Sequence, residues 1–107
     1  MHAIIDATHC NPISLSRPAV VSALIVDIAR SLELRIRHLH VQEFPGPLGS
    51  ALPGVSGVAL VSESHINIHT WPERELAQLC IQSCNAFPVD HVVALVNAAF
   101  DIPRATR

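Results

Sequence analysis

The segment from Ser64 to Thr70 alternates between two kinds of side chain, and this period of two constrains the fold more than any other feature. Serine, isoleucine and threonine occupy the even-numbered positions, and the odd-numbered positions hold His65, Asn67 and His69. Such alternation is typical of a half-buried strand, because successive side chains of a strand point to opposite faces. Packing alone does not require two imidazoles and an amide on one face. We therefore expect this face to form the wall of a site.

The neighbouring segments predict the rest of the sheet. Residues 54–62 are mostly apolar and end just before this strand, so we expect a hairpin with Glu63 and Ser64 at its tight bend. Further strands are expected at residues 2–8, 34–41 and 75–84. The last of these also fits a helix, but the alternation of Cys80, Gln82 and Cys84 favours a strand.

Two helices are expected, at residues 17–32 and 88–100. Ser14 or Ser16 is expected to cap the first one. The second is expected to face the core with Val92, Val93, Val96 and Phe100. The resulting order β-α-β-β-β-β-α predicts an α+β fold, a two-layer sandwich in which an antiparallel sheet carries both helices on one face. The other face of the sheet is then open to a partner subunit.

The composition limits the classes of function. The 107 residues are half hydrophobic and 15% charged, as in one globular domain, so a single domain over residues 1–107 is expected. A formal net charge of -2 does not favour binding to nucleic acid. The apolar run at 19–29 is too short to span a bilayer and no signal peptide is evident, so we expect a cytoplasmic protein. The excess of apolar surface predicts an oligomer.

The spacing of histidine and cysteine disfavours a metal site. His65 and His69 lie four residues apart, as do Cys80 and Cys84. On a strand such a pair shares a face but lies about 13 Å apart, so neither pair chelates one ion. Zinc patterns such as CxxC repeats are missing. A Cys–His nucleophile stays open for Cys84, whereas Cys80 is expected to pack as a small hydrophobic residue.

The Glu63–Ser64 peptide bond offers a third kind of chemistry. A serine hydroxyl can attack the carbonyl of its own preceding peptide bond if the backbone is strained and a donor stabilises the oxyanion. A tight hairpin bend can supply such strain. Ser56, on the adjoining strand, can offer a hydroxyl near the bend, and His69 can move a proton.

Residues 54–58 (GVSGV), 62–66 (SESHI) and 68–73 (IHTWPE) resemble the processing-site signature of the bacterial and archaeal S-adenosylmethionine decarboxylase proenzymes. The resemblance is dense across residues 54–73. It extends more weakly to His2, Asp6 and Cys10 in the first strand, to Ser83-Cys84 after a later strand, and to the helix at 89–100. Nearly the whole chain is covered.

The resemblance implies a self-cleaving, pyruvoyl-dependent enzyme. Ser64 attacks the Glu63 carbonyl, His69 matches the base of the following β-elimination, and Ser56 matches a residue that assists. Cleavage gives a β chain of residues 1–63 and an α chain of 64–107, with a covalent pyruvoyl group derived from Ser64. That group forms a Schiff base with the substrate amine as pyridoxal phosphate would, so neither pyridoxal phosphate nor a metal is expected. Cys84 matches the acid that reprotonates the substrate.

The family resemblance also implies a partner and a pathway. Members assemble as dimers of cleaved protomers with sites near the subunit interface, so a homodimer is expected. The implied substrate is S-adenosylmethionine, decarboxylated in spermidine and other polyamine biosynthesis.

The chain departs from the family in its substrate pocket. Residues 44–53 hold one aromatic residue where the family has an aromatic, basic segment, and Asn85 replaces a glycine. Phe44 and Phe87 are the candidates for stacking on an adenosyl group. Ornithine or arginine is an alternative substrate, because Asp6, Glu43 or Glu73 can pair with a distal cation. A second alternative is an unprocessed, non-catalytic paralogue that acts as a binding or regulatory subunit, which the intact Glu63, Ser64, His69 and Cys84 argue against.

Overall fold

The computed structural model describes residues 1–62 and 64–104. The strands within these residues are β1 (His2–Ala7), β2 (Ile36–Phe44), β3 (Gly54–Val61), β4 (Ser64–Trp71) and β5 (Leu76–Gln82). The helices are α1 (Pro12–Leu15), α2 (Pro18–Ser31), α3 (Val89–Ala99) and a 3-10 turn, η1 (Pro72–Arg74). The strand at 75–84 is therefore confirmed over its central part.

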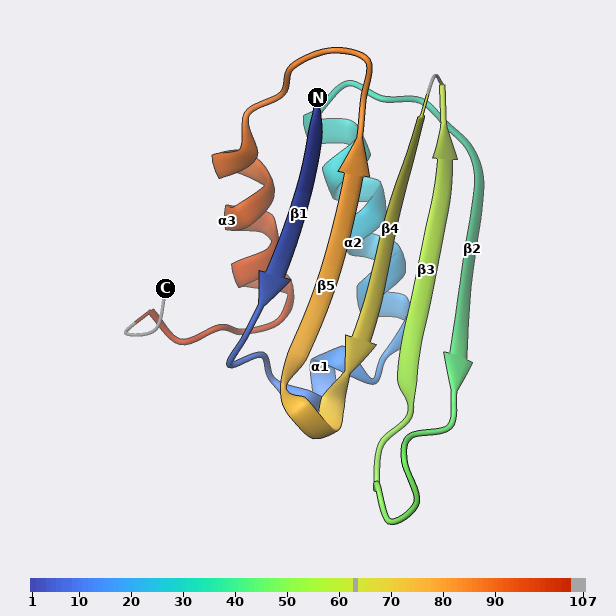
Figure 1. The fold of residues 1–107 in the computed structure, drawn as a ribbon, viewed down its shortest axis with the longest axis vertical. Helices are drawn as coiled ribbons and strands as arrows, with labels where there is room; N and C mark the ends of the chain where they lie inside the picture. Colours follow the sequence, from blue (N-terminus) through green and yellow to red (C-terminus); the bar gives the residue numbers. More distant parts are fainter. Residues whose placement is uncertain (63, 105–107) are drawn as a thin grey trace.

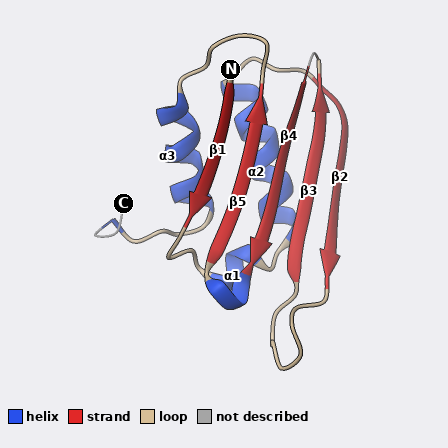
Figure 2. Cartoon of the chain, in the orientation of Figure 1, coloured by secondary structure: helices blue, strands red, loops and turns tan. Residues whose placement is uncertain are grey.

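The five strands form one antiparallel sheet in the order β1-β5-β4-β3-β2. Figure 1 shows α2 and α3 behind this sheet, and Figure 2 shows that none of the helices of the described residues crosses its front. The predicted two-layer α+β sandwich with two helices on one face is confirmed. The short α1 was not predicted. We call the face of the sheet away from α2 and α3 the open face.

Apolar side chains from the sheet and from both long helices fill the layer between them. Helix α2 contributes Val21, Leu24, Ile25 and Ile28, and it packs closely on β3 at Gly57. A Cβ atom at Gly57 would lie 2.8 Å from both Ile25 Cδ1 and Val21 Cγ1, so this glycine sets the approach of the helix. Helix α3 buries Val92 and Val96, but Val93 is 38% exposed, so the expectation that Val93 faces the core is wrong.

The start of α2 also differs from the prediction. Neither Ser14 nor Ser16 caps it, because both serines belong to the α1 turn, where Ser16 Oγ donates to Ile13 O at 2.7 Å. Helix α2 begins instead at Pro18, whose fixed φ suits a first helical position. Asn11 caps α1, since its Oδ1 accepts from Ile13 N at 2.9 Å.

The hairpin that carries the predicted site is formed by β3 and β4. Its register pairs Val61 with Ser64 at one end and Ser56 with His69 near the other. Glu63, which was expected at the bend, lies outside the described residues. Side chains of β4 alternate as predicted, with Ile66 and Ile68 buried against the helices and Asn67 exposed.

Thr70 ties β4 to α1 and provides a test of the buried polar network. Its side chain is 0% exposed, and its Oγ1 accepts from Val55 N at 2.9 Å and donates to Leu15 O at 2.8 Å. The isosteric Thr70→Val change leaves both backbone groups without this partner, so we expect about 2–4 kcal/mol loss of unfolding free energy. Thr70→Ser keeps the hydroxyl and is the control, expected to lose less. Urea unfolding measures both, and equal losses would contradict the assignment.

Candidate active site

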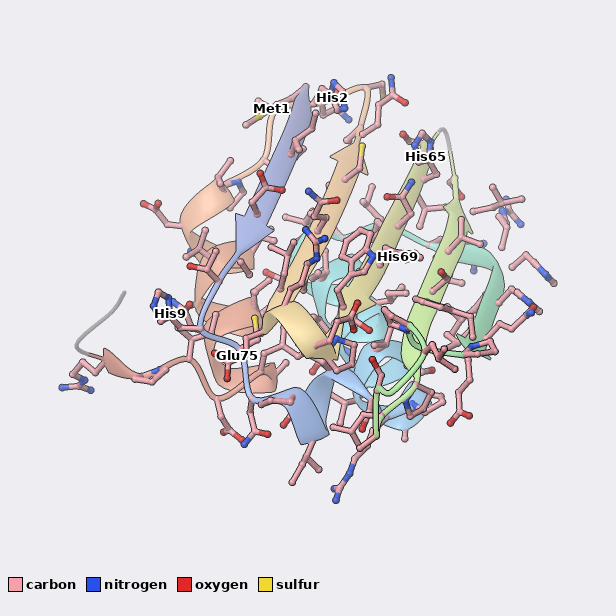
Figure 3. All side chains as sticks on the ribbon, turned by 60° about the horizontal axis from the view of Figure 1, so that its bottom comes forward. Met1, His2, His9, His65, His69 and Glu75 are labelled. Atoms are coloured by element: carbon pink, nitrogen blue, oxygen red, sulfur yellow. The ribbon has the colours of Figure 1, made fainter. Side chains whose placement is uncertain are left out.

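The open face of the sheet is polar and rich in histidine. The cross-strand register and the alternation of burial place five histidines on it, which are His2, His38, His40, His65 and His69. In Figure 3, His2 and His65 lie at the end of the sheet where the β3–β4 bend is, and His69 lies farther along β4. The prediction that one face of β4 is a wall of polar side chains is confirmed.

Ser56 and His69 form a short polar contact on this face. Ser56 Oγ lies 2.6 Å from His69 Nδ1, across the β3–β4 pair that the register joins. The imidazole also contacts two aromatic rings. Phe44 is stacked on it with ring centroids 4.6 Å apart and planes 19° apart, and Trp71 lies at 4.2 Å with planes tilted by 51°. We call Phe44, Ser56, His69 and Trp71 the histidine half-site.

Trp71 is a site residue that the sequence reasoning missed. It follows His69 by two positions on β4, so the same period of two places both on one face. That signal was available in the sequence. The stacking of Phe44 was not, because Phe44 lies on β2 and reaches His69 across β3.

The surroundings of His69 favour its neutral form. Burial lowers the pKa of His69 from its ordinary value of 6.5, and the charge of Glu73 partly offsets this by raising it. A neutral imidazole can accept a proton at neutral pH, which is the property that a general base needs.

A second group of candidate residues lies at the bend end of β4. Ser64, His65, Gln82, Ser83 and Cys84 line one hollow of about 330 Å³, and we call them the hairpin-end half-site. Cys84 is exposed there, just beyond the end of β5. The fold therefore brings Ser64 and Cys84 to the same hollow, although Ser64 begins β4 and Cys84 follows the end of β5.

The two half-sites are apart in one chain. Ser64 and His69 are five residues apart on one strand, which corresponds to about 17 Å. The expectation that Ser56 offers its hydroxyl near the bend is wrong within a protomer, because the register pairs Ser56 with His69 and not with Ser64. A hairpin of fixed register cannot bring its two ends together.

The predicted substrate-binding residues lie around the histidine half-site. Asp6, on β1, accepts a hydrogen bond from Gln78 Nε2 at 3.0 Å, and Gln78 in turn pairs with His69 in the register. Glu73 lies on η1 and lines a small hollow of about 120 Å³ with residues 50–52. Phe87, in contrast, is only 9% exposed in the core, so it offers no surface for stacking.

The other two cysteines differ in their surroundings. Cys10 is buried with its Sγ 3.4 Å from Ala7 O, and burial raises the pKa of its thiol to about 11, so it is a poor nucleophile. Cys80 lies on the open face with its Sγ 3.2 Å from His2 Nε2. The expectation that Cys80 packs as a buried hydrophobic residue is wrong, because its parity on β5 points it away from the helices.

Metal-binding clusters and membrane-spanning helices are both missing from the described part of the chain. Across residues 1–62 and 64–104, no three His, Cys, Asp or Glu side chains gather closely enough to hold a metal ion. None of the helices within these residues has the length and apolarity needed to cross a membrane.

Comparisons with known proteins agree with the resemblance found in the sequence. The family model described as S-adenosylmethionine decarboxylase matches residues 1–106. The chain is 31% identical over 104 residues to the S-adenosylmethionine decarboxylase proenzyme of Pyrococcus horikoshii, a match that covers 92% of this chain and 70% of that protein. It is 35% identical over 83 residues to the proenzyme of the same name from Thermodesulfovibrio yellowstonii, covering 78% of this chain and 57% of that one.

A third relative and a solved structure agree with these matches. The proenzyme of Pyrococcus furiosus is 31% identical over 83 residues, covering 78% of this chain and 55% of its own length. The chain thus spans between 55% and 70% of the length of these three relatives. The crystal structure of the adenosylmethionine decarboxylase from Aquifex aeolicus VF5 has the same fold, with a TM-score of 0.77 at 24% identity over 96% of this chain and 81% of that one.

Proposed function

The chain belongs to the S-adenosylmethionine decarboxylase family, and on that premise we propose that it is a proenzyme that cleaves itself between Glu63 and Ser64 and then decarboxylates S-adenosylmethionine. The observation that carries the proposal is the Ser56–His69 contact of 2.6 Å. It supplies a hydroxyl and a base on a site wall. The hollow shared by Ser64 and Cys84 supplies the nucleophile and an acid.

Self-cleavage needs only groups of the chain and one water molecule. The Ser64 hydroxyl attacks the Glu63 carbonyl carbon, the peptide C–N bond breaks, and the acyl group moves to oxygen as an ester. His69 then removes the Cα proton of residue 64, and the ester C–O bond breaks. Glu63 leaves as a carboxylate, and dehydroalanine remains at position 64. Addition of water and loss of ammonia give the pyruvoyl group, and chains 1–63 and 64–107 stay in one fold.

The hairpin-end half-site fits such a group. A small α-keto acyl group at position 64 needs open space and a nearby acid. The hollow of about 330 Å³ provides the space, and the exposed Cys84 at its wall provides the acid. When formed, the pyruvoyl group supplies an electron sink for loss of carbon dioxide from an α-amino acid. Cys84 then delivers a proton to the α-carbon of the product.

The substrate is proposed to be S-adenosylmethionine because each of the three relatives is named an S-adenosylmethionine decarboxylase proenzyme. Ornithine, arginine and a non-catalytic role are not favoured by any of these matches. We assign Glu73 and Phe44 to the substrate side of the histidine half-site, where a carboxylate can accept hydrogen bonds from sugar hydroxyls. Asp6, held by Gln78, is proposed as a more distant polar contact.

The active unit is proposed to be a homodimer, since His69 cannot reach Ser64 of its own chain. A copy turned by 180° about an axis that crosses the strands next to Asn67 exchanges the two ends of β4, because the midpoint between Ser64 and His69 lies between Ile66 and Asn67. With the open faces together, the histidine half-site of each protomer then lies over the hairpin-end half-site of its partner. Each site takes Ser64 and Cys84 from one chain and Ser56 and His69 from the other.

The open face has apolar residues where this axis would run. The register aligns one row across the sheet, made of Ile4, Cys80, Asn67, Val58 and His40. Ile4 is 70% exposed and Val58 is 38% exposed. A second copy would remove this apolar surface from water. Pairing through sheet edges would instead leave the two half-sites several strands apart.

The intact mass of the purified protein under denaturing conditions tests the function. We expect two species, residues 1–63 and a 64–107 fragment that is lighter by one ammonia than the same fragment with serine. Release of carbon dioxide from S-adenosylmethionine, compared with ornithine and arginine, then identifies the substrate. A chain that stays whole after prolonged incubation would contradict the proposal.

The lowered pKa of His69 predicts the pH dependence of self-cleavage. Because burial holds the pKa below 6.5, the imidazole stays neutral as the pH falls through that value and becomes protonated only at lower pH. We expect the cleavage rate to hold near pH 6.5 and to fall below it, when measured between about pH 5 and 8. A fall centred above pH 6.5 would show that another group limits cleavage.

A further inference from the structure

The imidazole of His69 is held at three places. Ser56 Oγ contacts Nδ1 at 2.6 Å, Phe44 stacks on the ring and Trp71 lies tilted against it. Among the described residues, Nε2 of His69 has no hydrogen-bond partner. Nε2 is therefore the nitrogen available to accept a proton, provided that Nδ1 carries the ring proton and donates it to Ser56.

We propose that Phe44 is a positioning residue for His69, and that Gly54 is the feature of the backbone that lets it act. This inference rests on the proposed function for the role of His69 as a base. The stacking of Phe44 on His69 is observed independently of that function. The ring of Phe44 fixes the plane of the imidazole, so that Nε2 points out of the open face while Nδ1 stays on Ser56.

Gly54 explains how a residue on β2 reaches β4. Phe44 pairs with Gly54 at the end of the β2–β3 ladder, and β3 separates β2 from β4. A Cβ atom at Gly54 would lie 2.1 Å from Phe44 Cζ and 2.4 Å from its Cε2. The ring thus lies in the space that a side chain at position 54 would fill, and it crosses β3 to stack on His69.

A second contact is needed because one hydrogen bond does not fix a ring. His69 is only partly buried on an open sheet face, so its side chain would otherwise exchange between rotamers. Misplacing a reacting group by about 1 Å can cost about a hundredfold in rate. The stacked phenyl ring also keeps water from one side of the imidazole. It thereby contributes to the burial that lowers the pKa of His69.

Self-cleavage separates this role from substrate stacking. If Phe44 served only as a platform for the adenosyl group, its loss would raise KM and leave self-cleavage unchanged, because cleavage precedes substrate binding. If Phe44 positions His69, its loss slows cleavage itself. The two roles therefore predict opposite results for one measurement.

The test compares Phe44→Leu, Phe44→Tyr, Gly54→Ala and Leu48→Ala in the full chain. We expect Phe44→Leu and Gly54→Ala to slow self-cleavage by about tenfold or more, and Phe44→Tyr to restore it because the stacked ring is kept. Leu48 is fully exposed in the same β2–β3 connection and is the matched control, expected to cleave at the wild-type rate. Wild-type cleavage in Phe44→Leu, with only KM raised, would overturn the proposal.

A second readout does not depend on activity. In an uncleaved Ser64→Ala background, ¹⁵N NMR of the histidine side chains reports which nitrogen of His69 is protonated and where the ring titrates. We expect one Nδ1–H tautomer with Phe44, and a mixture of tautomers with a pKa closer to 6.5 in Phe44→Leu. An unchanged tautomer and titration would overturn the proposal. If the wild type never cleaves, the proposed function fails and this measurement still decides the role of Phe44.

Discussion

Replacing Ser64 with alanine is expected to leave the protein as one unbroken chain of 107 residues, whatever the time of incubation. The change removes the only atom that can form the ester with Glu63, so neither elimination nor the pyruvoyl group can follow. We expect loss of cleavage and of decarboxylation together, below detection by intact mass and by carbon dioxide release. The fold should be unaffected, because Ser64 is at the end of β4 and is not part of the core.

Ser62→Ala is the matched control for this experiment. Ser62 lies on the other side of the same bend, and its Oγ accepts a hydrogen bond from Arg37 Nε at 3.2 Å. Its hydroxyl has no role in the proposed chemistry, so the variant should cleave normally at the Glu63–Ser64 bond. Cleavage of Ser64→Ala, or a stop in cleavage in Ser62→Ala, would show that the scissile bond has been assigned wrongly.

A mixed dimer of a Ser64→Ala chain and a His69→Ala chain is expected to recover one of its two sites. Each single variant should be inactive as a homodimer, because every site then lacks either the nucleophile or the base. In the mixed dimer, Ser64 of the His69→Ala chain meets His69 of the Ser64→Ala chain, if sites are shared between protomers. The chain that lacks its own His69 should therefore be cleaved, and its partner should stay whole.

Co-expression with two different affinity tags isolates the mixed dimer, and intact mass identifies which chain is cleaved. The matching control joins two Ser64→Ala chains with different tags, which should both stay whole. If each site were built within one chain, no chain of the mixed dimer would cleave, and the face-to-face arrangement about Asn67 would be wrong. The experiment thus tests the dimer separately from the chemistry.

The local elements of this fold were predictable because their signals lie within short windows of sequence. The period of two in 64–70 placed β4 and assigned His65, Asn67 and His69 to one face, as observed. Periodicity also gave α2 and α3 and resolved β5 in favour of a strand. The cap of α2 and the burial of Val93 were predicted wrongly, because neighbouring structure decided them and not the pattern itself. The burial of Cys80 was also predicted wrongly, although its place in the alternation of β5 puts it on the open face.

The sequence by itself determined which residue types the site contains and which elements carry them, because periodicity and a dense signature are local properties. Only the tertiary structure decided how those residues meet. The register of β3 on β4 joined Ser56 to His69 and held both away from Ser64, and the sheet order brought Cys84 beside Ser64 and Phe44 beside His69. Such pairings depend on contacts between segments far apart in the chain. The side-chain pattern of one strand does not specify which strands lie beside it or how their ends are aligned with its own.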